Sequence, residues 1–245
     1  MADPLLWQIS TVTAIRAETS EVSSFTLRLP NWRTHRAGQH YDVRLTAADG
    51  YQAQRSYSIA SPPSRTGEVD LTIERIAGGE VSPYFHDILE LGHQVEVRGP
   101  IGGYFVWEPA LGGPLLLVAG GSGVVPLMAM LRERATADSR PSAVLLYSSR
   151  TVDDVIYRDE LASLATNDSG LRLIQTLTRS QPAGWTGYDR RIDRPMLTEA
   201  IAAAGSQPLV YICGPTLLVE AAANGLVELG VPAAQVRTER FGPTS

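Results

Sequence analysis

One stretch decides the fold expected for the second half of the chain: Leu115-Leu116-Leu117-Val118-Ala119-Gly120-Gly121-Ser122-Gly123-Val124-Val125-Pro126. An uninterrupted apolar run leads into a cluster of glycines and then into residues that can begin a helix. This order is typical of a buried strand that turns tightly into a helix, because glycine adopts turn conformations that other residues avoid. Backbone N–H groups at such a turn, together with the positive end of the helix, are suited to receive a phosphate. Pro126 stands where the common dinucleotide-binding fingerprint has glycine, and proline costs little in the first turn of a helix.

Downstream of this stretch, short apolar segments alternate with segments that can form helices. The expected strands are 115–119, 143–148, 171–177, 209–213 and 235–240, and the expected helices are 124–134, 153–165, 194–204 and 216–229. This alternation predicts a doubly wound α/β domain, in which helices cover both faces of a parallel sheet. The loop Gly112-Gly113-Pro114 marks the expected boundary, so this domain is predicted to cover residues 112–245.

Upstream, residues 1–111 show the alternation of short strands. The expected strands are 6–15, 22–29, 40–45, 54–59, 69–75 and 94–98. Turns such as Pro30-Asn31 and Asp49-Gly50 separate them, which predicts an antiparallel sheet or a small β-barrel. One helix, 82–91, is expected to interrupt the strands. Ser82 is its expected N-cap and Pro83 suits its first position, which leaves the helix N-terminus open to an anion.

The composition argues against several kinds of function. A net charge of −5 and a pI near 5.4, without a dense block of basic residues, argue against a nucleic-acid-binding protein. No signal peptide and no apolar run of membrane-spanning length are evident, so we expect a cytoplasmic protein without a membrane partner. The single cysteine, Cys213, cannot hold an iron–sulfur cluster, and the four histidines lack metal-ligand spacing, so no metal site is expected.

Arg55-Ser56-Tyr57-Ser58 is the second informative stretch, at the end of an alternating run. An arginine, an aromatic ring and a hydroxyl at alternate positions are expected to project onto one face of a strand. The guanidinium can grip a diphosphate, the ring offers a flat face to an isoalloxazine, and the hydroxyl can donate to flavin N5. An exposed arginine beside a packed tyrosine would explain the stretch equally well on its own. The helix expected at Ser82 favours a flavin site, since its N–H groups can meet the same diphosphate and Gly79 permits a close approach.

The order of five segments resembles the ferredoxin–NADP reductase family, a flavin and pyridine-nucleotide module without an iron–sulfur domain. The segments are Arg55-Ser56-Tyr57-Ser58, Gly79-Glu80-Val81-Ser82, Gly120-Gly121-Ser122-Gly123-Val124-Val125-Pro126, Cys213-Gly214-Pro215 and Glu239-Arg240-Phe241. None is decisive alone, but together they span nearly the whole chain in the expected order. The resemblance implies an FAD-binding β-barrel domain over residues 1–111 and an NAD(P)-binding α/β domain over residues 112–245.

By this resemblance, the flavin contacts are expected in two parts of the first domain. They are Arg55, Ser56, Tyr57 and Ser58 on the strand, Gly79, Val81 and Ser82 at the helix start, and Glu74, Arg75 and Ile76 before it. A strand arginine combined with a helix start suits a diphosphate, which favours FAD as the cofactor. FMN, which some related modules hold, is left open.

The nucleotide contacts are expected where strands of the second domain end. Gly121, Ser122 and Gly123 are expected to receive the diphosphate. In this family Cys213-Gly214-Pro215 lies beside the nicotinamide, although a merely buried thiol is an alternative for Cys213. Arginines follow the second and third strands of the domain: Arg150, Arg179, Arg190 and Arg191. Arginines suit the 2′-phosphate of NADP, whereas a carboxylate often binds the ribose diol of NAD, so NADPH is favoured and NADH is left open.

The last strand is expected to take part in the reaction. Alternation puts Glu239 and Phe241 on one side of it. In this family an acid there lies near the nicotinamide and an aromatic residue covers the flavin; the tail 242–245 could bend toward the cofactor. The resemblance implies hydride transfer from nicotinamide to flavin N5, with Ser58 and Cys213 positioning the reacting edges. A solvent-facing Glu239 and a Phe241 that only caps the sheet are the alternatives.

The electron acceptor is expected to be a separate protein. Reduced flavin can release its electrons singly, which implies a ferredoxin, a flavodoxin or the haem or metal component of an oxygenase as partner. Two other functions stay open at this point: a reductase of free flavin, ferric chelates or quinones, and a non-catalytic flavin electron-transfer subunit. Related modules work alone, so the resemblance implies a monomer.

Overall fold

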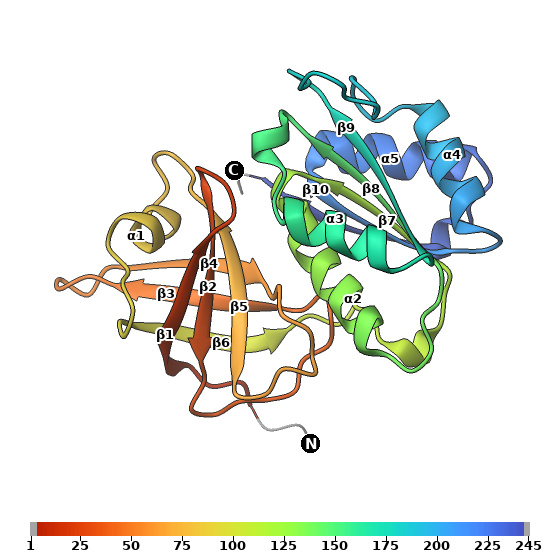
Figure 1. Ribbon diagram of the computed structural model, residues 1–245. Helices are drawn as coiled ribbons and strands as arrows, with labels where there is room; N and C mark the ends of the chain where they lie inside the picture. Colours follow the sequence, from red (N-terminus) through yellow and green to blue (C-terminus); the bar gives the residue numbers. More distant parts are fainter. Residues whose placement is uncertain (1–3, 243–245) are drawn as a thin grey trace. The chain divides into compact units, whose positions relative to one another are not determined.

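The computed structural model describes residues 4–242, and the chain divides into two compact units (Figure 1). The first unit comprises the residues up to Trp107 together with Met128–Thr136, and the second comprises Glu108–Leu127 together with the residues from Ala137 onward. Most of helix α2 Val124–Thr136 thus groups with the first unit. The predicted domain limits, 1–111 and 112–245, stay a prediction. Over residues 4–242, no helix combines the length and the hydropathy needed to cross a membrane.

The first unit is built on a six-stranded sheet in the order β4-β3-β6-β1-β2-β5, in which every pair of neighbours is antiparallel. The strands are β1 Gln8–Ala17, β2 Val22–Arg28, β3 His40–Thr46, β4 Gln52–Ser58, β5 Glu68–Glu74 and β6 Gln94–Ile101. Ile59, directly after β4, forms a bridge with Leu71 of β5, and the Ala60 N–H donates to the Asp70 carbonyl at 2.8 Å. The two edge strands therefore meet and close the sheet into a barrel, which removes its free edges. The predicted antiparallel β-barrel is confirmed.

The barrel core follows from the alternation of apolar residues along the strands. Val69, Leu71 and Ile73 of β5 are fully buried, as period-two spacing requires when one face of a strand lies inside. Phe25 of β2 contacts Phe85 edge to face, with ring centroids 5.0 Å apart. Phe85 belongs to α1 Ser82–Asp87, so this helix closes one part of the core.

Helix α1 differs from its prediction at both ends. It stops at Asp87 rather than Leu91, because Ile88 leaves the helical region and the chain turns to bury Leu89. Ser82 is not the N-cap: Val81 holds that position without a side-chain cap. The Ser82 hydroxyl instead accepts the N–H of Ile76 at 3.1 Å, so it closes the turn before the helix. The N-cap prediction was wrong because this hydroxyl found a partner earlier in the chain.

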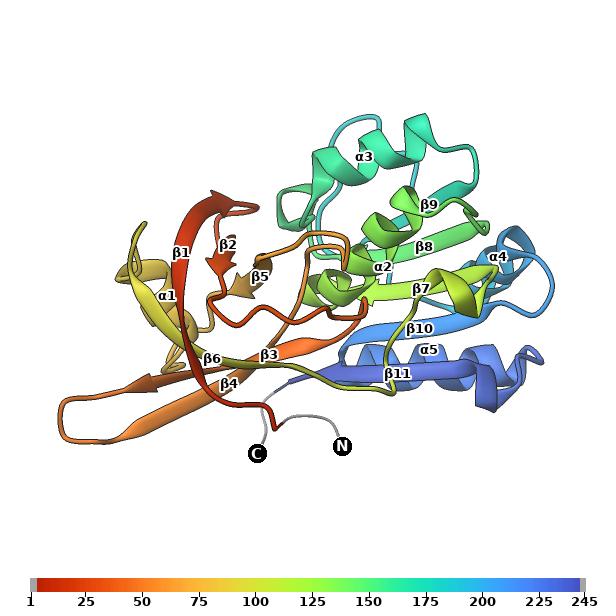
Figure 2. The ribbon, with the colours of Figure 1, turned by 90° about the horizontal axis from the view of Figure 1, so that it is seen from below.

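The second unit contains a five-stranded parallel sheet in the order β11-β10-β7-β8-β9. The strands are β7 Leu115–Gly120, β8 Ala143–Ser149, β9 Leu171–Leu177, β10 Leu209–Pro215 and β11 Val236–Phe241, and the helices are α2 Val124–Thr136, α3 Arg158–Asn167, α4 Arg194–Ala204 and α5 Thr216–Glu228. Met196 and Ala200 of α4 and Ala222 of α5 pack on one face of the sheet. Helices α2 and α3 lie on the other face (Figure 2). The predicted doubly wound α/β fold is confirmed.

The connection between β8 and α3 is the element that the sequence predicted least well. In place of one helix over 153–165, a 3-10 turn at Val152–Asp154 precedes α3. Thr151 and Asp154 form a capping box that starts this short turn, and Tyr157 then interrupts the helical path with a φ of 59°. A bulky residue with positive φ is uncommon, so a tyrosine at position 157 gives no sign in the sequence that the helix begins only after it.

Candidate functional site

The predicted flavin stretch lies at the end of β4 in the first unit. Arg55 and Tyr57 are two residues apart and share one face of the strand, whereas Ser58 belongs to the opposite alternation. Arg55 is exposed, Tyr57 is half-buried and Ser58 is buried. The expectation that arginine, ring and hydroxyl all project from one face was therefore wrong, because the hydroxyl stands an odd number of residues from the arginine. Ser58 is the last residue of β4, where the strand edge ends.

Tyr57 is held firmly against the barrel core. Its ring lies 5.9 Å from that of Phe85, at an angle of 52°. Burial raises the pKa of Tyr57 well above the ordinary tyrosine value, so its hydroxyl stays neutral. A neutral aromatic ring fixed by packing is a suitable surface for another flat ring. Ser56, by contrast, donates to the buried Asp42 carboxylate at 2.7 Å and belongs to a different set of contacts.

The Arg55 guanidinium has one short hydrogen bond and one long ion pair among residues 4–242. It donates to the neighbouring Gln54 carbonyl at 2.6 Å and lies 3.8 Å from the Glu80 carboxylate. Glu80 is itself held by the Tyr51 hydroxyl, which donates to it at 2.6 Å. An exposed arginine without a close carboxylate can still grip a diphosphate, because most of its five N–H donors remain available.

The turn before α1 is compact. Gly78, not Gly79, has the positive φ, at 74°. A Cβ on Gly79 would lie 3.1 Å from the Ile76 carbonyl oxygen, so Gly79 lets the turn close upon itself. Val81 is buried, and Ile76 is 54% exposed. This turn therefore presents backbone and one apolar side chain.

Two further predicted flavin contacts stand just before this turn. Arg75 is committed to Asp87 of α1, with an N–O distance of 2.9 Å. Glu74 is the last residue of β5. With Arg75 occupied, Arg55, Tyr57 and Ser58 form the donor set of this unit that fits a flavin: a cation for its diphosphate, a flat ring and a hydroxyl.

The glycine turn after β7 opens the second candidate site. Gly121 has a φ of 52°, and an added Cβ would meet nothing within 4 Å. A Cβ on Gly123 would lie 2.2 Å from the Cys213 carbonyl oxygen, and one on Gly120 would lie 2.6 Å from the Leu218 side chain. The sequence predicted that Gly121 and Gly123 would both receive the diphosphate. Instead, Gly120 and Gly123 let the β7–α2 and β10–α5 turns touch, and Gly121 alone faces open space.

The predicted arginines fall into two groups. Arg150 and Arg179 lie side by side, because the Arg179 N–H donates to the Arg150 carbonyl at 2.8 Å. Both are exposed, and neither forms an ion pair with any residue between 4 and 242. Arg190 is engaged: it donates to Asp193 at 2.7 Å and lies over the ring of Tyr188. Arg191 is exposed in the same loop. Arg150 and Arg179 thus form a cationic pair at the carboxyl edge of the sheet, where ligands of open α/β sheets bind.

Cys213 and Glu239 are neighbours across β10 and β11, as register partners. Cys213 is fully buried, and burial, together with the nearby Glu239, raises the pKa of its thiol well above the ordinary value. Desolvation raises the pKa of Glu239 to about 7, and its Oε2 atom is buried and has no hydrogen-bond partner among residues 4–242. The pair therefore combines a neutral thiol with a carboxyl group that can hold a proton near neutral pH.

Phe241 and the C-terminal turn contain the remaining predicted contacts. Phe241 pairs with Pro215 in the β10–β11 register and is half-buried. Gly214 has a φ of 150°, and a Cβ there would lie 2.9 Å from the Gly120 carbonyl oxygen, so it too serves the contact between the two turns. Ser122 lies between the open and the packed glycine. The covering of a flavin by Phe241 stays a prediction, and residues 243–245 of the predicted tail lie outside the described residues.

Sequence reasoning missed two side chains that the structure brings to these sites. Glu80 stands within the Gly79–Ser82 stretch and faces Arg55, so an acid inside a predicted anion site was its signal. Tyr147 follows the apolar residues Ala143–Leu146 of β8, and its hydroxyl reaches the Gly121 carbonyl. A polar group in a buried strand end is a usable signal, because such groups need partners.

Comparison with known proteins agrees with this arrangement. Residues 10–106 match the family described as the oxidoreductase FAD-binding domain, and residues 117–224 match the oxidoreductase NAD-binding domain. The chain is 38% identical over 212 residues to ferredoxin–NADP reductase B of Sorangium cellulosum, which covers 84% of each chain. It is 33% identical over 209 residues to the glycine betaine monooxygenase reductase subunit of Pseudomonas aeruginosa, covering 84% of this chain and 56% of that relative.

A solved structure supports the fold. The FAD/NAD-binding domain of a nitric oxide dioxygenase from Vibrio cholerae superimposes with a TM-score of 0.83 at 23% identity, covering 96% of this chain and 98% of that one. This likeness concerns the fold alone. Together with the two domain matches and the relative that is 38% identical, it places the chain in the ferredoxin–NADP reductase-like family of FAD-containing oxidoreductases.

Proposed function

We propose that this protein takes a hydride from NADPH onto FAD and passes the electrons singly to a separate redox protein. The observation that carries the proposal is the presence of two complementary donor sets in one chain. The first unit supplies Arg55, Tyr57 and Ser58, and the second supplies the open Gly121 turn with the Arg150–Arg179 pair. Among the relatives, the reductase subunit of a monooxygenase supports the choice of a separate protein as acceptor.

The residues of the first unit would bind and orient the flavin. Arg55 would bind the diphosphate, Tyr57 would support one face of the ring system, and Ser58 would donate to its reactive edge. Bound FAD supplies the conversion of a two-electron donor into one-electron deliveries. These roles need no movement of Tyr57, since Phe85 already fixes its ring.

The residues of the second unit would hold the nucleotide and handle a proton. The backbone at Gly121 would meet the diphosphate, and Cys213 would lie beside the nicotinamide. Glu239, with a pKa raised to about 7 by desolvation, holds or releases a proton at its carboxylate near neutral pH. Phe241 would cover the flavin and move aside when the nicotinamide binds.

The choice of NADPH rests on Arg150 and Arg179. Two exposed arginines whose backbones are hydrogen-bonded to each other suit a 2′-phosphate, which brings two further negative charges to this edge of the sheet. No carboxylate stands at the end of β8, where one often binds the ribose diol of NAD; Arg150 follows Ser149 there.

Anaerobic reduction tests this function directly. The purified protein is mixed with NADPH or NADH, and the flavin absorbance is followed without an acceptor. We expect rapid bleaching with NADPH and slower bleaching with NADH. Comparable efficiency with NADH would remove the NADPH preference, and a flavin that stays oxidised with both nucleotides would contradict the hydride-transfer function itself.

The electron acceptor is tested in a second step. A ferredoxin, a flavodoxin or an oxygenase component is added, and its reduction by NADPH is measured through the reductase. The relatives support this class, since one is a ferredoxin–NADP reductase and another is the reductase subunit of a monooxygenase. Fast turnover with free flavin, ferric chelates or quinones and none with any protein carrier would contradict the proposed partner.

A further inference from the structure

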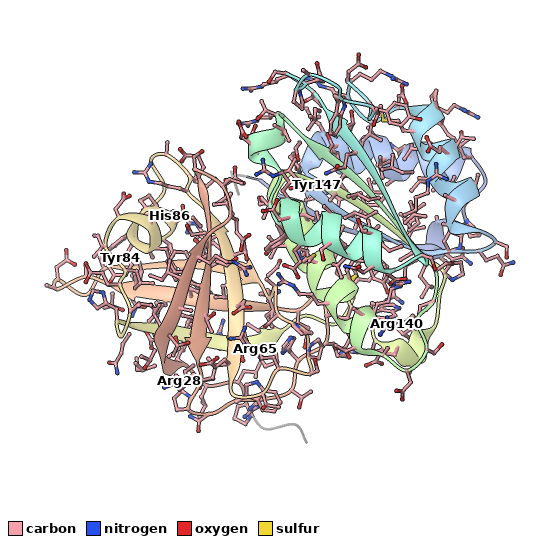
Figure 3. The ribbon with its side chains drawn as sticks, in the orientation of Figure 1. Arg28, Arg65, Tyr84, His86, Arg140 and Tyr147 are labelled. Atoms are coloured by element: carbon pink, nitrogen blue, oxygen red, sulfur yellow. The ribbon has the colours of Figure 1, made fainter. Side chains whose placement is uncertain are left out.

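Tyr147 ties together two connections at the carboxyl edge of the parallel sheet (Figure 3). Its hydroxyl donates to the Gly121 carbonyl, which follows β7, at 3.2 Å. The same hydroxyl accepts the Ile156 N–H, which precedes α3, also at 3.2 Å. Tyr147 is buried; its contact with Ile156 is buried and its contact with Gly121 is partly buried, so the loss of the hydroxyl would leave a buried N–H without its acceptor.

The Gly121 carbonyl has two donors. It accepts the Val124 N–H at the end of the 3-10 turn Gly121–Gly123 and the Tyr147 hydroxyl from β8. Gly121 has a φ of 52°, and no atom lies within 4 Å of the place where a Cβ would stand, so Tyr147 adds to this turn a side-chain restraint from another strand. The Tyr147 hydroxyl holds the Gly121 carbonyl toward the buried side of the sheet. A carbonyl that turned outward would present a partial negative charge to an incoming phosphate. The hydroxyl thus keeps this turn in a form that an anion can approach.

The second contact of Tyr147 orders the segment that carries Arg150. The capping box of Thr151 and Asp154 shapes the start of this segment, and Ile156 is tied to Tyr147 at its end. Tyr157 follows with a φ of 59°, a conformation that a bulky residue keeps only when its surroundings impose it. Because the Arg150 carbonyl accepts the Arg179 N–H, this order extends to the neighbouring loop.

We propose that Tyr147 is a positioning residue for the nucleotide, whose hydroxyl holds the Gly121 turn and the Arg150 segment in one arrangement before the nucleotide arrives. The proposal rests on the proposed function, because it assumes that this edge binds a pyridine nucleotide. Tyr147 acts through Gly121 and Ile156 and need not touch the ligand. Loss of the Tyr147 hydroxyl should therefore weaken the binding of both NADPH and NADH, whereas loss of the Arg150 side chain should weaken only the binding of the 2′-phosphate of NADPH.

The experiment compares the FAD-loaded wild-type protein with Tyr147→Phe. Each is titrated with NADP+ and with NAD+ while the flavin absorbance is followed, so binding is read without turnover. We expect both dissociation constants to rise by roughly three- to tenfold, the range of one lost hydrogen bond, with KM raised and kcat little changed. Tyr211→Phe is the matched control, since it removes another buried tyrosine hydroxyl from this sheet, bonded to Arg237. Its nucleotide affinities should equal those of the wild type.

A second variant reaches the same peptide from its other end. Gly121→Ala adds a methyl group that meets no atom, but it shifts the turn away from its positive φ, so it should also weaken both nucleotides. Melting curves verify that both variants are folded. Unchanged affinities in Gly121→Ala, or in a folded Tyr147→Phe, would overturn the positioning role. Failure of the wild-type protein to bind either nucleotide would instead contradict the proposed function.

Discussion

The two candidate sites use different groups of the protein: side chains at the end of β4 and backbone at the end of β7. At the end of β4 the chemistry lies in side chains, with an arginine, a tyrosine ring and a serine hydroxyl within four consecutive residues. At the end of β7 it lies in the backbone of Gly121, which is shaped by neighbouring turns and by a distant tyrosine. A side-chain site can lose one group and keep its fold, whereas a backbone site depends on the packing around it. Substitutions at the first should change affinity, and those at the second should often change stability.

The largest effect is expected at Gly123, where a substitution tests whether the backbone site depends on packing. In Gly123→Ala the new methyl group would stand 2.2 Å from the Cys213 carbonyl oxygen, so backbone must move. We expect the free energy of unfolding to fall by about 3–5 kcal/mol, measured by denaturant titration. Gly121→Ala is the control, with a cost of about 1 kcal/mol from its positive φ alone. Equal losses of unfolding free energy in the two variants would contradict the assignment of Gly123 to packing and of Gly121 to binding.

The next largest effect concerns the side-chain site. Arg55→Gln removes the cation proposed for the flavin diphosphate, and we expect flavin affinity to fall by about 2 kcal/mol, or about thirtyfold. Flavin fluorescence during titration of the apoprotein measures this change. Arg75→Gln removes the same charge from a residue already paired with Asp87, so its flavin affinity should change little. A larger loss in Arg75→Gln than in Arg55→Gln would reassign the diphosphate contact.

Glu239 should give the second unit a stability that depends on pH. Desolvation raises its pKa from 4.5 to about 7, so the folded state favours the protonated form. The resulting stabilisation is complete below the unfolded pKa and is lost as the pH rises through about 7. Since the side chain is partly in contact with water, we expect a loss of about 1–2 kcal/mol between about pH 5 and 8. Melting temperatures of Glu239→Gln should lack this decline, and those of Glu220→Gln, which changes a half-buried acid paired with Arg240, should retain it. An identical pH dependence in all three proteins would show that Glu239 titrates normally.

The smallest expected effect concerns the preference for NADPH over NADH at the second candidate site. Arg150→Gln should weaken NADPH binding by about 1 kcal/mol, or about fivefold, and leave NADH binding unchanged. The contribution is modest because the guanidinium is exposed and screened by solvent. Arg172→Gln is a suitable control, since that arginine is exposed and paired with Glu199. Equal weakening of NADPH and NADH by Arg150→Gln would remove its role at the 2′-phosphate.

The sequence was most informative where chemistry and local pattern coincide. Alternating apolar residues predicted the antiparallel sheet, continuous apolar segments between helices predicted the parallel sheet, and helix 194–204 has the predicted bounds. Side-chain type and spacing selected Arg55 and Tyr57 as candidate flavin contacts, because a charged fork and a ring within three residues limit the possible ligands; their role stays a prediction. Residue type also identified Arg150 and Arg179, which their loops then bring together.

Sequence reasoning failed where partners distant in the chain decide. The packing role of Gly123 depends on Cys213, ninety residues later in the chain. The Tyr147 contacts join residues 26 positions apart in one case and nine in the other. Local propensity contains no information on such meetings, so these residues could be interpreted only once the sheet order was known.

Closure of the barrel gives the flavin residues a position at its seam. Ile59, which bridges to Leu71, directly follows Ser58, so the hydroxyl proposed for the flavin is covalently next to the contact that joins the first and last strands of the sheet. Opening that seam would release the end of β4 and separate Ser58 from its surroundings. A flavin bound there favours the closed form over every open one, and the gain grows with the logarithm of flavin concentration relative to its dissociation constant. Flavin binding would thus also stabilise the closed barrel. In the apoprotein, amide hydrogens along this seam should exchange before those of the other strands.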